Sequence, residues 1–239
     1  MTKVMIKGDI VDNATGVFYS WFDMDAVTPK SVSDTLLDAE GGDVEVDIAS
    51  NGGDVFAASE IYTMLKDYPG KVIVNIQGLA ASAATVIAMA GDEINMSPTA
   101  QMMIHQVWMN TSGNADDLRN QALSLDQADE SIINAYELKT GLDRADLLQM
   151  MSAETWMNAQ TALDKGFIDK IMFVDEEQPQ LVNATHKLPS REAINRFMSI
   201  LAKDRQSKPV AQLETEEQEQ NQTKQEPSLR ERKLALLRK

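Results

Sequence analysis

Two hydrophobic periodicities alternate along the first hundred residues. Apolar and polar positions repeat with a period of two over residues 3–10, 43–50 and 71–77, which is typical of β-strands. Two further short strands are predicted near the sequences EINM and QMMIH, after the turn at Gly91-Asp92. Between the strands, apolar positions recur at helical spacing instead.

Helices are predicted in three of these intervals. A polar turn follows the first strand, and a helix then opens at Pro29 and runs through Leu37. Residues 54–68 carry a helical stripe, and an alanine-rich helix covers about residues 82–90. Asn51-Gly52-Gly53 is expected to end the second strand and Gly78 to end the third. The order strand, glycine turn, helix predicts βαβ units and a largely parallel sheet, in which sites form at the carboxyl ends of strands.

A second part of the chain reads as helical from Asn114 to Met151, with a break at Gly141. Its apolar stripe consists of Leu118, Ala122, Leu125, Ile132, Ile133 and Tyr136. The segment 155–173 is expected to form a short helix (NAQTALDKG) followed by a strand (DKIMFV). We therefore place a folded domain at residues 1–174.

The remaining residues, 175–239, form a polar tail. Residues 206–226 are dominated by Gln, Glu and Lys and cannot bury enough apolar surface to fold alone. Short amphipathic segments flank them at 191–203 and 228–239, and the latter begins with a capping box at Ser228. The sequence predicts a largely disordered linker with interaction segments.

Composition narrows the possible functions. The formal charge of −15 makes nucleic acid an unfavourable partner. The chain has no cysteine, which excludes disulfides, thiolate catalysis and Cys-ligated metals. No phosphate-binding loop, clustered metal ligands, signal peptide or membrane span is predicted, so we expect a cytoplasmic protein without cofactor or metal.

Two side chains stand out as candidates for chemistry. His105 ends an apolar strand, and Ser82 begins the helix after strand 71–77, where free N–H groups favour a developing oxyanion. Each has an ordinary alternative, a strand-end histidine and a helix N-cap respectively. Because adjacent βα loops of a parallel sheet open on one edge, the N–H groups of Gly53 and Ala83 are expected to face one point and form an oxyanion hole.

Three motifs, in this order and spacing, resemble the Clp protease proteolytic subunit: Asn51-Gly52-Gly53, Gly78-Leu79-Ala80-Ala81-Ser82-Ala83 and Met103-Ile104-His105-Gln106. The resemblance runs from about Lys3 to Val174. It implies an α/β Clp/crotonase-like spiral of β-β-α units with a projecting helical handle, and a serine endopeptidase that forms homo-oligomeric rings. It also implies that Ser82 is the nucleophile, His105 the base, and Gly53 and Ala83 the oxyanion donors.

The same resemblance assigns the third triad member to Glu154, in Glu154-Thr155-Trp156, where the family has an aspartate. A helix-start acid is the ordinary alternative for Glu154, and Asp143 and Asp146 are the fallback candidates for the triad.

Two features resemble the Clp-type proteases that mature phage proheads, namely Glu-Thr-Trp at the acid position and Asn51-Gly52-Gly53-Asp54-Val55-Phe56. A start almost at the first strand and the polar tail agree with that branch. The expected substrate is a polypeptide, either capsid or scaffold protein, and recruitment of an ATPase stays open. A crotonase-like acyl-CoA enzyme and a non-catalytic scaffold protein are the two alternatives.

Overall fold

The computed structural model describes residues 1–174, and the predicted tail at 175–239 lies outside these residues. The described chain runs in the order β1 (Thr2–Ile10), α1 (Asn13–Trp21), β2 (Ala26–Val27), α2 (Pro29–Asp38), β3 (Val44–Gly53), α3 (Val55–Lys66), β4 (Val72–Ala81), α4 (Ala83–Ala88), β5 (Glu93–Met96), β6 (Gln101–Ile104), α5 (Ala115–Thr140), α6 (Arg144–Ser152), β7 (Thr155–Asn158), α7 (Ala159–Asp164) and β8 (Lys170–Ile171).

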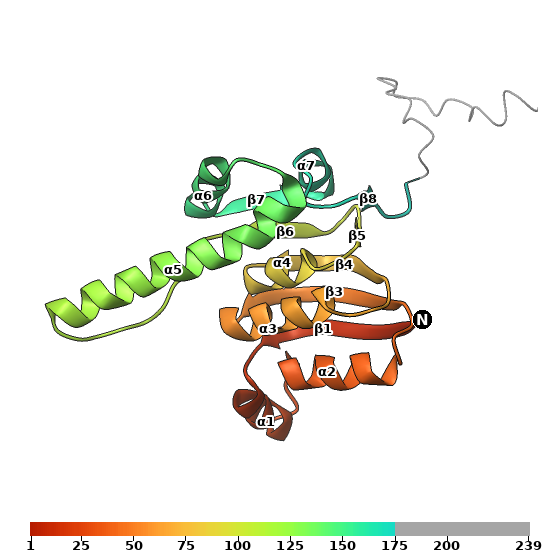
Figure 1. Cartoon of the computed structure of the whole chain (residues 1–239), viewed down its shortest axis with the longest axis horizontal. Helices are drawn as coiled ribbons and strands as arrows, with labels where there is room; N and C mark the ends of the chain where they lie inside the picture. The colour runs from red at the N-terminus through yellow and green to blue at the C-terminus, as the bar shows by residue number, and fades with distance from the viewer. Residues whose placement is uncertain (175–239) are drawn as a thin grey trace, which may run out of the picture. The chain divides into compact units, whose positions relative to one another are not determined.

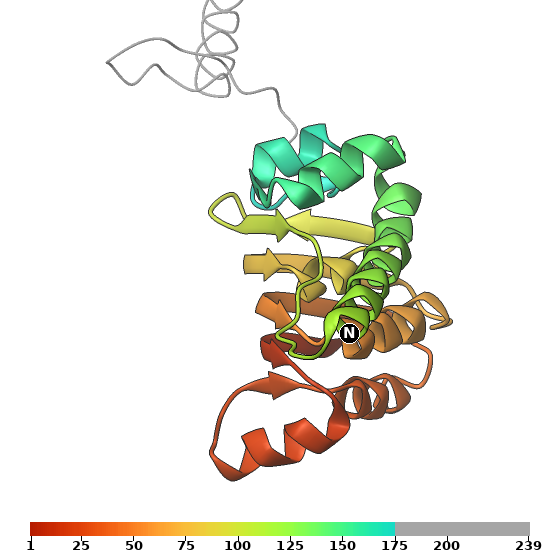
Figure 2. The same ribbon diagram turned by 90° about the vertical axis from the view of Figure 1, so that its left-hand side faces the viewer.

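The strands form one sheet with the order β2-β1-β3-β4-β5-β8, and β6 pairs with both β4 and β7. Every pairing is parallel except β6 with β7, which confirms the mostly parallel sheet. Helices α2, α3 and α4 lie on one side of the central strands (Figures 1 and 2). The strand side chains beneath them, such as Val46, Ile48 and Val74, are fully buried and form the core.

Local sequence signals explain where the helices begin. Thr28 and Ser31 form a capping box around Pro29 at the start of α2. Asp54 caps α3 by accepting a hydrogen bond from the Ala57 N–H. The last long helix, α5, ends at Gly141 in the left-handed conformation, so the predicted break there is confirmed.

The predicted apolar stripe of α5 divides into two parts. Ile132, Ile133 and Tyr136 are buried against the core, whereas Leu118 and Ala122 in the first half are exposed. The first half of the helix extends past the rest of the domain (Figure 1). The projecting helical handle is therefore present, and only its second half packs on the core.

Three local predictions were wrong. Strand β3 does not stop before Gly52 and Gly53 but includes them as its last two residues, and Gly78 lies inside β4. The polar turn after the first strand is helix α1. In addition, the sequence did not predict the short strands β2 and β7. Long-range pairing explains the two glycine differences. Strand β3 continues alongside β1 as far as the pair Ile10–Gly53, and β4 continues past Gly78 alongside β6 as far as the pair Ala81–Met103.

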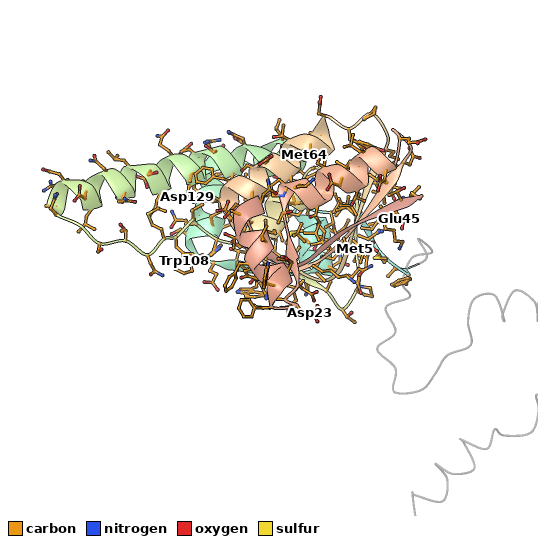
Figure 3. All side chains as sticks on the ribbon, turned by 90° about the horizontal axis from the view of Figure 1, so that it is seen from below. Met5, Asp23, Glu45, Met64, Trp108 and Asp129 are labelled. Carbon is orange, nitrogen blue, oxygen red and sulfur yellow. The ribbon has the colours of Figure 1, made fainter. Side chains whose placement is uncertain are left out.

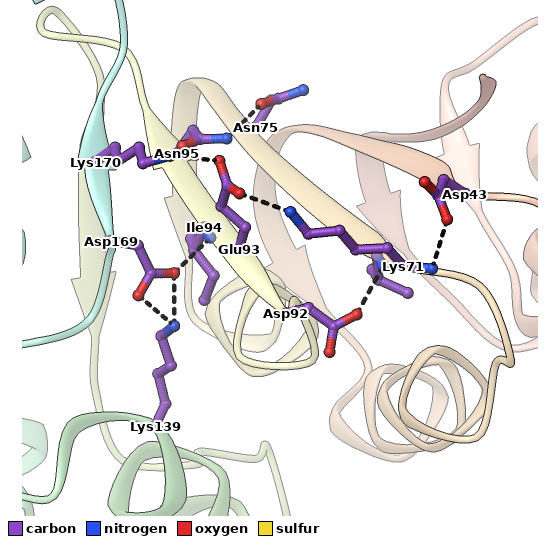
Figure 4. A network of polar contacts seen from close by, with 11 residues as sticks. Asp43, Lys71, Asn75, Asp92, Glu93, Ile94, Asn95, Lys139, Asp169 and Lys170 are labelled. Atoms are coloured by element: carbon purple, nitrogen blue, oxygen red, sulfur yellow. Dashed lines mark hydrogen bonds and ion pairs between the residues drawn. The ribbon is translucent and has the colours of Figure 1, made fainter.

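A network of charged side chains joins the amino ends of the strands (Figure 4). Lys71 and Lys170 both pair with Glu93 at the start of β5, at 2.8 and 3.2 Å. These cations lower the pKa of Glu93 to about 2, from an ordinary value of 4.5. On the same edge, Lys139 of α5 pairs with Asp169 at 2.7 Å. The charge network thus lies at the opposite end of the strands from Ser82 and His105, which follow the carboxyl ends of β4 and β6.

Within residues 1–174, no helix is both long enough and apolar enough to cross a membrane.

Candidate active site

Ser82 sits in a strained turn between the end of β4 and the start of α4. Its backbone has φ +53° and ψ −126°, a conformation that non-glycine residues rarely adopt and that is often found at functional sites. The turn is held by the Ser82 N–H, which donates to the Met103 carbonyl at 2.9 Å. Although Ser82 occupies the N-cap position, its hydroxyl makes no capping hydrogen bond. The side chain is therefore free to bond elsewhere.

That hydroxyl bonds to His105. The distance from His105 Nε2 to Ser82 Oγ is 2.7 Å. The sheet brings the two together because β4 and β6 run parallel, with Ala81 paired to Met103, so that both chain segments leave the sheet at the same edge. A hydroxyl within hydrogen-bonding distance of an imidazole is the arrangement that activates a serine nucleophile.

Gly52 at the end of β3 allows the backbone to approach the Ser82 turn closely, and Gly53 allows it to approach Ile10 of β1. Gly52 has φ +101° and Gly53 has φ +147°, and both conformations favour glycine. A Cβ on Gly52 would lie 2.8 Å from the Ser82 Cβ and 3.0 Å from the Ala83 nitrogen. Ala83 is the first residue of α4, where the N–H has no partner within the helix.

These groups surround one cavity of about 250 Å³. Its lining residues are Gly53, Asp54, Val55, Phe56, Ser82, Ala83, Val86, His105, Val107, Trp108, Met109 and Ile132. Apart from the reacting groups the lining is mainly apolar, and it contains no lysine or arginine. Phe56 and Trp108 are largely exposed. The cavity therefore suits an apolar side chain placed beside Ser82 and His105.

Comparison with known proteins agrees with this geometry. Residues 27–175 match the family model described as Clp protease. The chain belongs to the Clp protease family.

Relatives of this Clp protease family member include the "ATP-dependent Clp protease proteolytic subunit" of Deinococcus radiodurans, 30% identical over 57% of this chain and 69% of the relative. A second is "ATP-dependent Clp protease proteolytic subunit 1" of Chlamydia abortus, 30% identical over 71% of this chain and 91% of the relative. The solved structure of a ClpP1 mutant from Listeria monocytogenes has the same fold, with a TM-score of 0.59, 24% identity, and coverage of 72% and 91% of the two chains.

Glu154, the predicted acid of this Clp-type site, lies close to His105 along the backbone but does not contact its ring. The antiparallel register of β6 and β7 ends at the pair Ile104–Thr155, and His105 and Glu154 are the next residues beyond that pair on the two chain segments. The Glu154 carboxylate, however, is exposed and accepts a hydrogen bond from Trp156 Nε1 at 3.2 Å. Glu154 has φ +49°, a second strained backbone at this site.

The two fallback acids lie on α6. Asp143 caps that helix by accepting from the Ala145 N–H at 2.8 Å, and Asp146 is in its first turn. Within residues 1–174, no carboxylate contacts the His105 ring, and the bond it makes goes to Ser82.

Two polar residues near the site were not anticipated. Asp129 and Tyr136 lie on the inner face of α5 and are 5% and 1% exposed. Asp129 accepts a hydrogen bond from the Val107 N–H at 2.7 Å, and the Tyr136 hydroxyl lies 2.6 Å from Thr85 Oγ1. The sequence carries a signal for Asp129. It falls four residues after Leu125, so it occupies a position on the apolar stripe of the predicted helix where an apolar residue is expected.

Burial raises the pKa of both side chains. For Asp129 desolvation is the main cause, opposed by the Val107 N–H and by the nearby His105. For Tyr136 desolvation again dominates, and the hydrogen bond with Thr85 acts in the opposite direction.

Proposed function

We propose that this protein is a serine endopeptidase that hydrolyses peptide bonds through an acyl-enzyme. The observation that carries the proposal is the 2.7 Å contact between His105 Nε2 and Ser82 Oγ, at a strained strand-to-helix turn beside an apolar cavity. Membership of the Clp protease family agrees with this reaction.

In the first half of the reaction, Ser82 Oγ attacks the carbonyl carbon of the scissile bond while its proton passes to His105 Nε2. The carbonyl oxygen gains the negative charge and accepts hydrogen bonds from the N–H groups of Gly53 and Ala83. His105 then gives the proton to the leaving amine, and the C–N bond breaks. Water repeats these steps on the ester and releases the acid.

Glu154 is the proposed orienting acid. Glu154 directly precedes Thr155, the partner of Ile104, and His105 directly follows Ile104. We therefore expect a change of the Glu154 rotamer away from Trp156 to bring its carboxylate toward Nδ1 of the imidazole. A carboxylate there holds the useful tautomer and stabilises the imidazolium that forms during attack.

The cavity indicates the substrate class. Val86, Val107 and Ile132 form apolar walls, so we propose a preference for a medium-sized apolar residue before the cleaved bond. The absence of lysine and arginine from this lining disfavours the crotonase alternative, because acyl-CoA carries phosphates that basic side chains commonly bind.

For biological role, we propose a phage prohead maturation protease that acts as a homo-oligomeric ring in the bacterial cytoplasm. Glu154-Thr155-Trp156, the Asn51–Phe56 motif and the polar tail composition support this branch. Portal and major capsid genes next to this gene would support the assignment, and a neighbourhood of unrelated metabolic genes would argue against it.

The test of the reaction compares Ser82→Ala with Ser59→Ala. Ser59 lies on α3, where its hydroxyl bonds to the Val55 carbonyl and has no part in the site. Ser82→Ala should fold normally, lose fluorophosphonate labelling and lose about 10³-fold or more in peptide hydrolysis. Ser59→Ala should keep both. Unchanged hydrolysis by Ser82→Ala would overturn the proposed function.

A further inference from the structure

One face of α5 contacts both reacting segments through polar side chains. Asp129 and Tyr136 are seven residues apart, which is two helical turns, so they lie on the same side of the helix. Both are buried in the domain. Figure 3 shows Asp129 at the flank of the domain that also carries Trp108, and Trp108 lines the active-site cavity. A buried polar side chain among apolar neighbours needs a partner, and here the partners, Thr85 and Val107, lie in the chain segments that follow Ser82 and His105.

Tyr136 reaches the nucleophile turn through Thr85. Thr85 Oγ1 lies 2.5 Å from the Ser82 carbonyl oxygen, and a carbonyl only accepts, so the Thr85 proton is used there. The 2.6 Å contact between Thr85 and Tyr136 must then use the Tyr136 proton. The resulting chain runs from Tyr136 O–H to Thr85 O–H to the Ser82 carbonyl. It holds the residue whose backbone is strained at φ +53°.

Asp129 reaches the segment that follows the base. Its Oδ1 accepts the Val107 N–H at 2.7 Å, two residues after His105. Val107 lies beyond the end of β6 at Ile104, so no strand pairing holds it. The hydrogen bond to Asp129 supplies an anchor where the sheet no longer does.

We propose that Asp129 and Tyr136 are positioning residues, which together hold His105 and Ser82 at bonding distance from one rigid helix face. This inference rests on the proposed peptidase function. Its physical basis is that Ser82 and His105 keep their separation when their two chain segments are both anchored to the same rigid helix, α5. Catalysis depends on such placement, since a displacement of about 1 Å costs about 10²-fold in rate.

The first experiment uses Thr85→Val and Thr85→Ser. Valine matches the shape of threonine but cannot bond to either neighbour, whereas serine keeps the hydroxyl. We expect Thr85→Val to lower kcat about tenfold or more while KM stays within about twofold, because Thr85 does not line the cavity. Thr85→Ser should restore kcat. Tyr136→Phe should lower kcat as much as Thr85→Val does. The double variant Thr85→Val/Tyr136→Phe should have a kcat no lower than either single variant, since each of the three breaks the same hydrogen-bond chain.

The second experiment uses Asp129→Ala and Asp129→Asn. Asparagine retains an oxygen that can accept the Val107 N–H, so Asp129→Asn should keep kcat within about fivefold, whereas Asp129→Ala should lose about tenfold or more. The rate of fluorophosphonate labelling at Ser82 should fall in parallel. Thr140→Val is the control, because it also removes a half-buried hydroxyl from α5. That hydroxyl donates to the Tyr136 carbonyl and accepts from the Leu142 N–H, both at the end of the helix.

The outcomes separate this inference from the proposed function. If Ser82→Ala abolishes hydrolysis while Thr85→Val and Asp129→Ala retain full kcat, the positioning role is wrong and the peptidase stands. Loss of kcat in Thr140→Val equal to that in Thr85→Val would also overturn it, because the effect would then be one of general stability. If Ser82→Ala remains active, the proposed function itself fails.

Discussion

Gly52→Ala is the substitution whose effect the structure specifies most closely. Gly52 is buried at the end of β3, with φ +101°. A Cβ there would lie 2.7 Å from the Ala81 carbonyl oxygen and 2.8 Å from the Ser82 Cβ. Both contacts are to the turn that carries the nucleophile. The substitution therefore changes the position of Ser82 while leaving its hydroxyl and His105 unaltered.

The size of the effect follows from these distances. Restoring an ordinary contact of 3.4 Å to the Ser82 Cβ requires a movement of about 0.6 Å. A strained φ costs about 1 to 3 kcal/mol and overpacking a similar amount, so we expect a loss of about 3 kcal/mol and a fall in Tm of about 6 to 12 °C. A shift of several tenths of an ångström at the nucleophile should reduce kcat about tenfold or more.

The assay combines thermal unfolding with peptide hydrolysis and fluorophosphonate labelling below the lowered Tm. Gly78→Ala is the matched control, because a Cβ on Gly78 of β4 would meet nothing within 4 Å and its φ is not positive. It should retain kcat and Tm. Wild-type kcat and Tm in Gly52→Ala would refute the argument that the close approach of β3 positions Ser82.

Four other predictions concern the acid, the charge network, the tail and assembly. Glu154→Gln should cut hydrolysis strongly yet leave slow labelling of Ser82, and damage from Asp143→Asn instead would show that the acid is misassigned. The pKa of Glu93 is about 2 in the folded protein, against an ordinary value of 4.5. The Glu93 carboxylate therefore stabilises the fold above about pH 4.5, and this stabilisation is lost as the pH falls toward 2. Glu93→Gln should therefore lower the free energy of unfolding at pH 7, by no more than about 1 kcal/mol for each of the two solvent-exposed cation partners. Near pH 2 the variant should match the wild type in urea unfolding. An equal difference at both pH values would contradict this. Deletion of residues 206–239 should preserve cleavage of a small peptide and impair processing of the protein substrate, whereas loss of small-peptide cleavage would refute a tether. Light scattering should show a ring-sized oligomer, and a stable, active monomer at micromolar concentration would refute it.

The sequence by itself determined most of the strands, most of the helices and the order of the motifs. These features depend on short-range regularities: a period of two in β1, β3 and β4, helical spacing in α3, and capping residues such as Thr28 and Asp54. Ser82 and His105 were singled out because each ends or begins an element at the same sheet edge, and a parallel sheet brings such edges together. Helix α1 gave no comparable signal, since its Val17, Phe18 and Trp21 are exposed.

Only the tertiary structure decided how the site is held. Gly52 and Gly53 extend β3 because its partner β1 continues beside them, which no local pattern records. The contact between Thr85 and Tyr136 joins residues 51 positions apart, and that between Val107 and Asp129 joins residues 22 apart. The direction of the Glu154 side chain likewise depends on Trp156 and on a strained backbone. Periodicity reports which face of an element is buried, whereas the partner that a buried polar group meets depends on how distant elements pack.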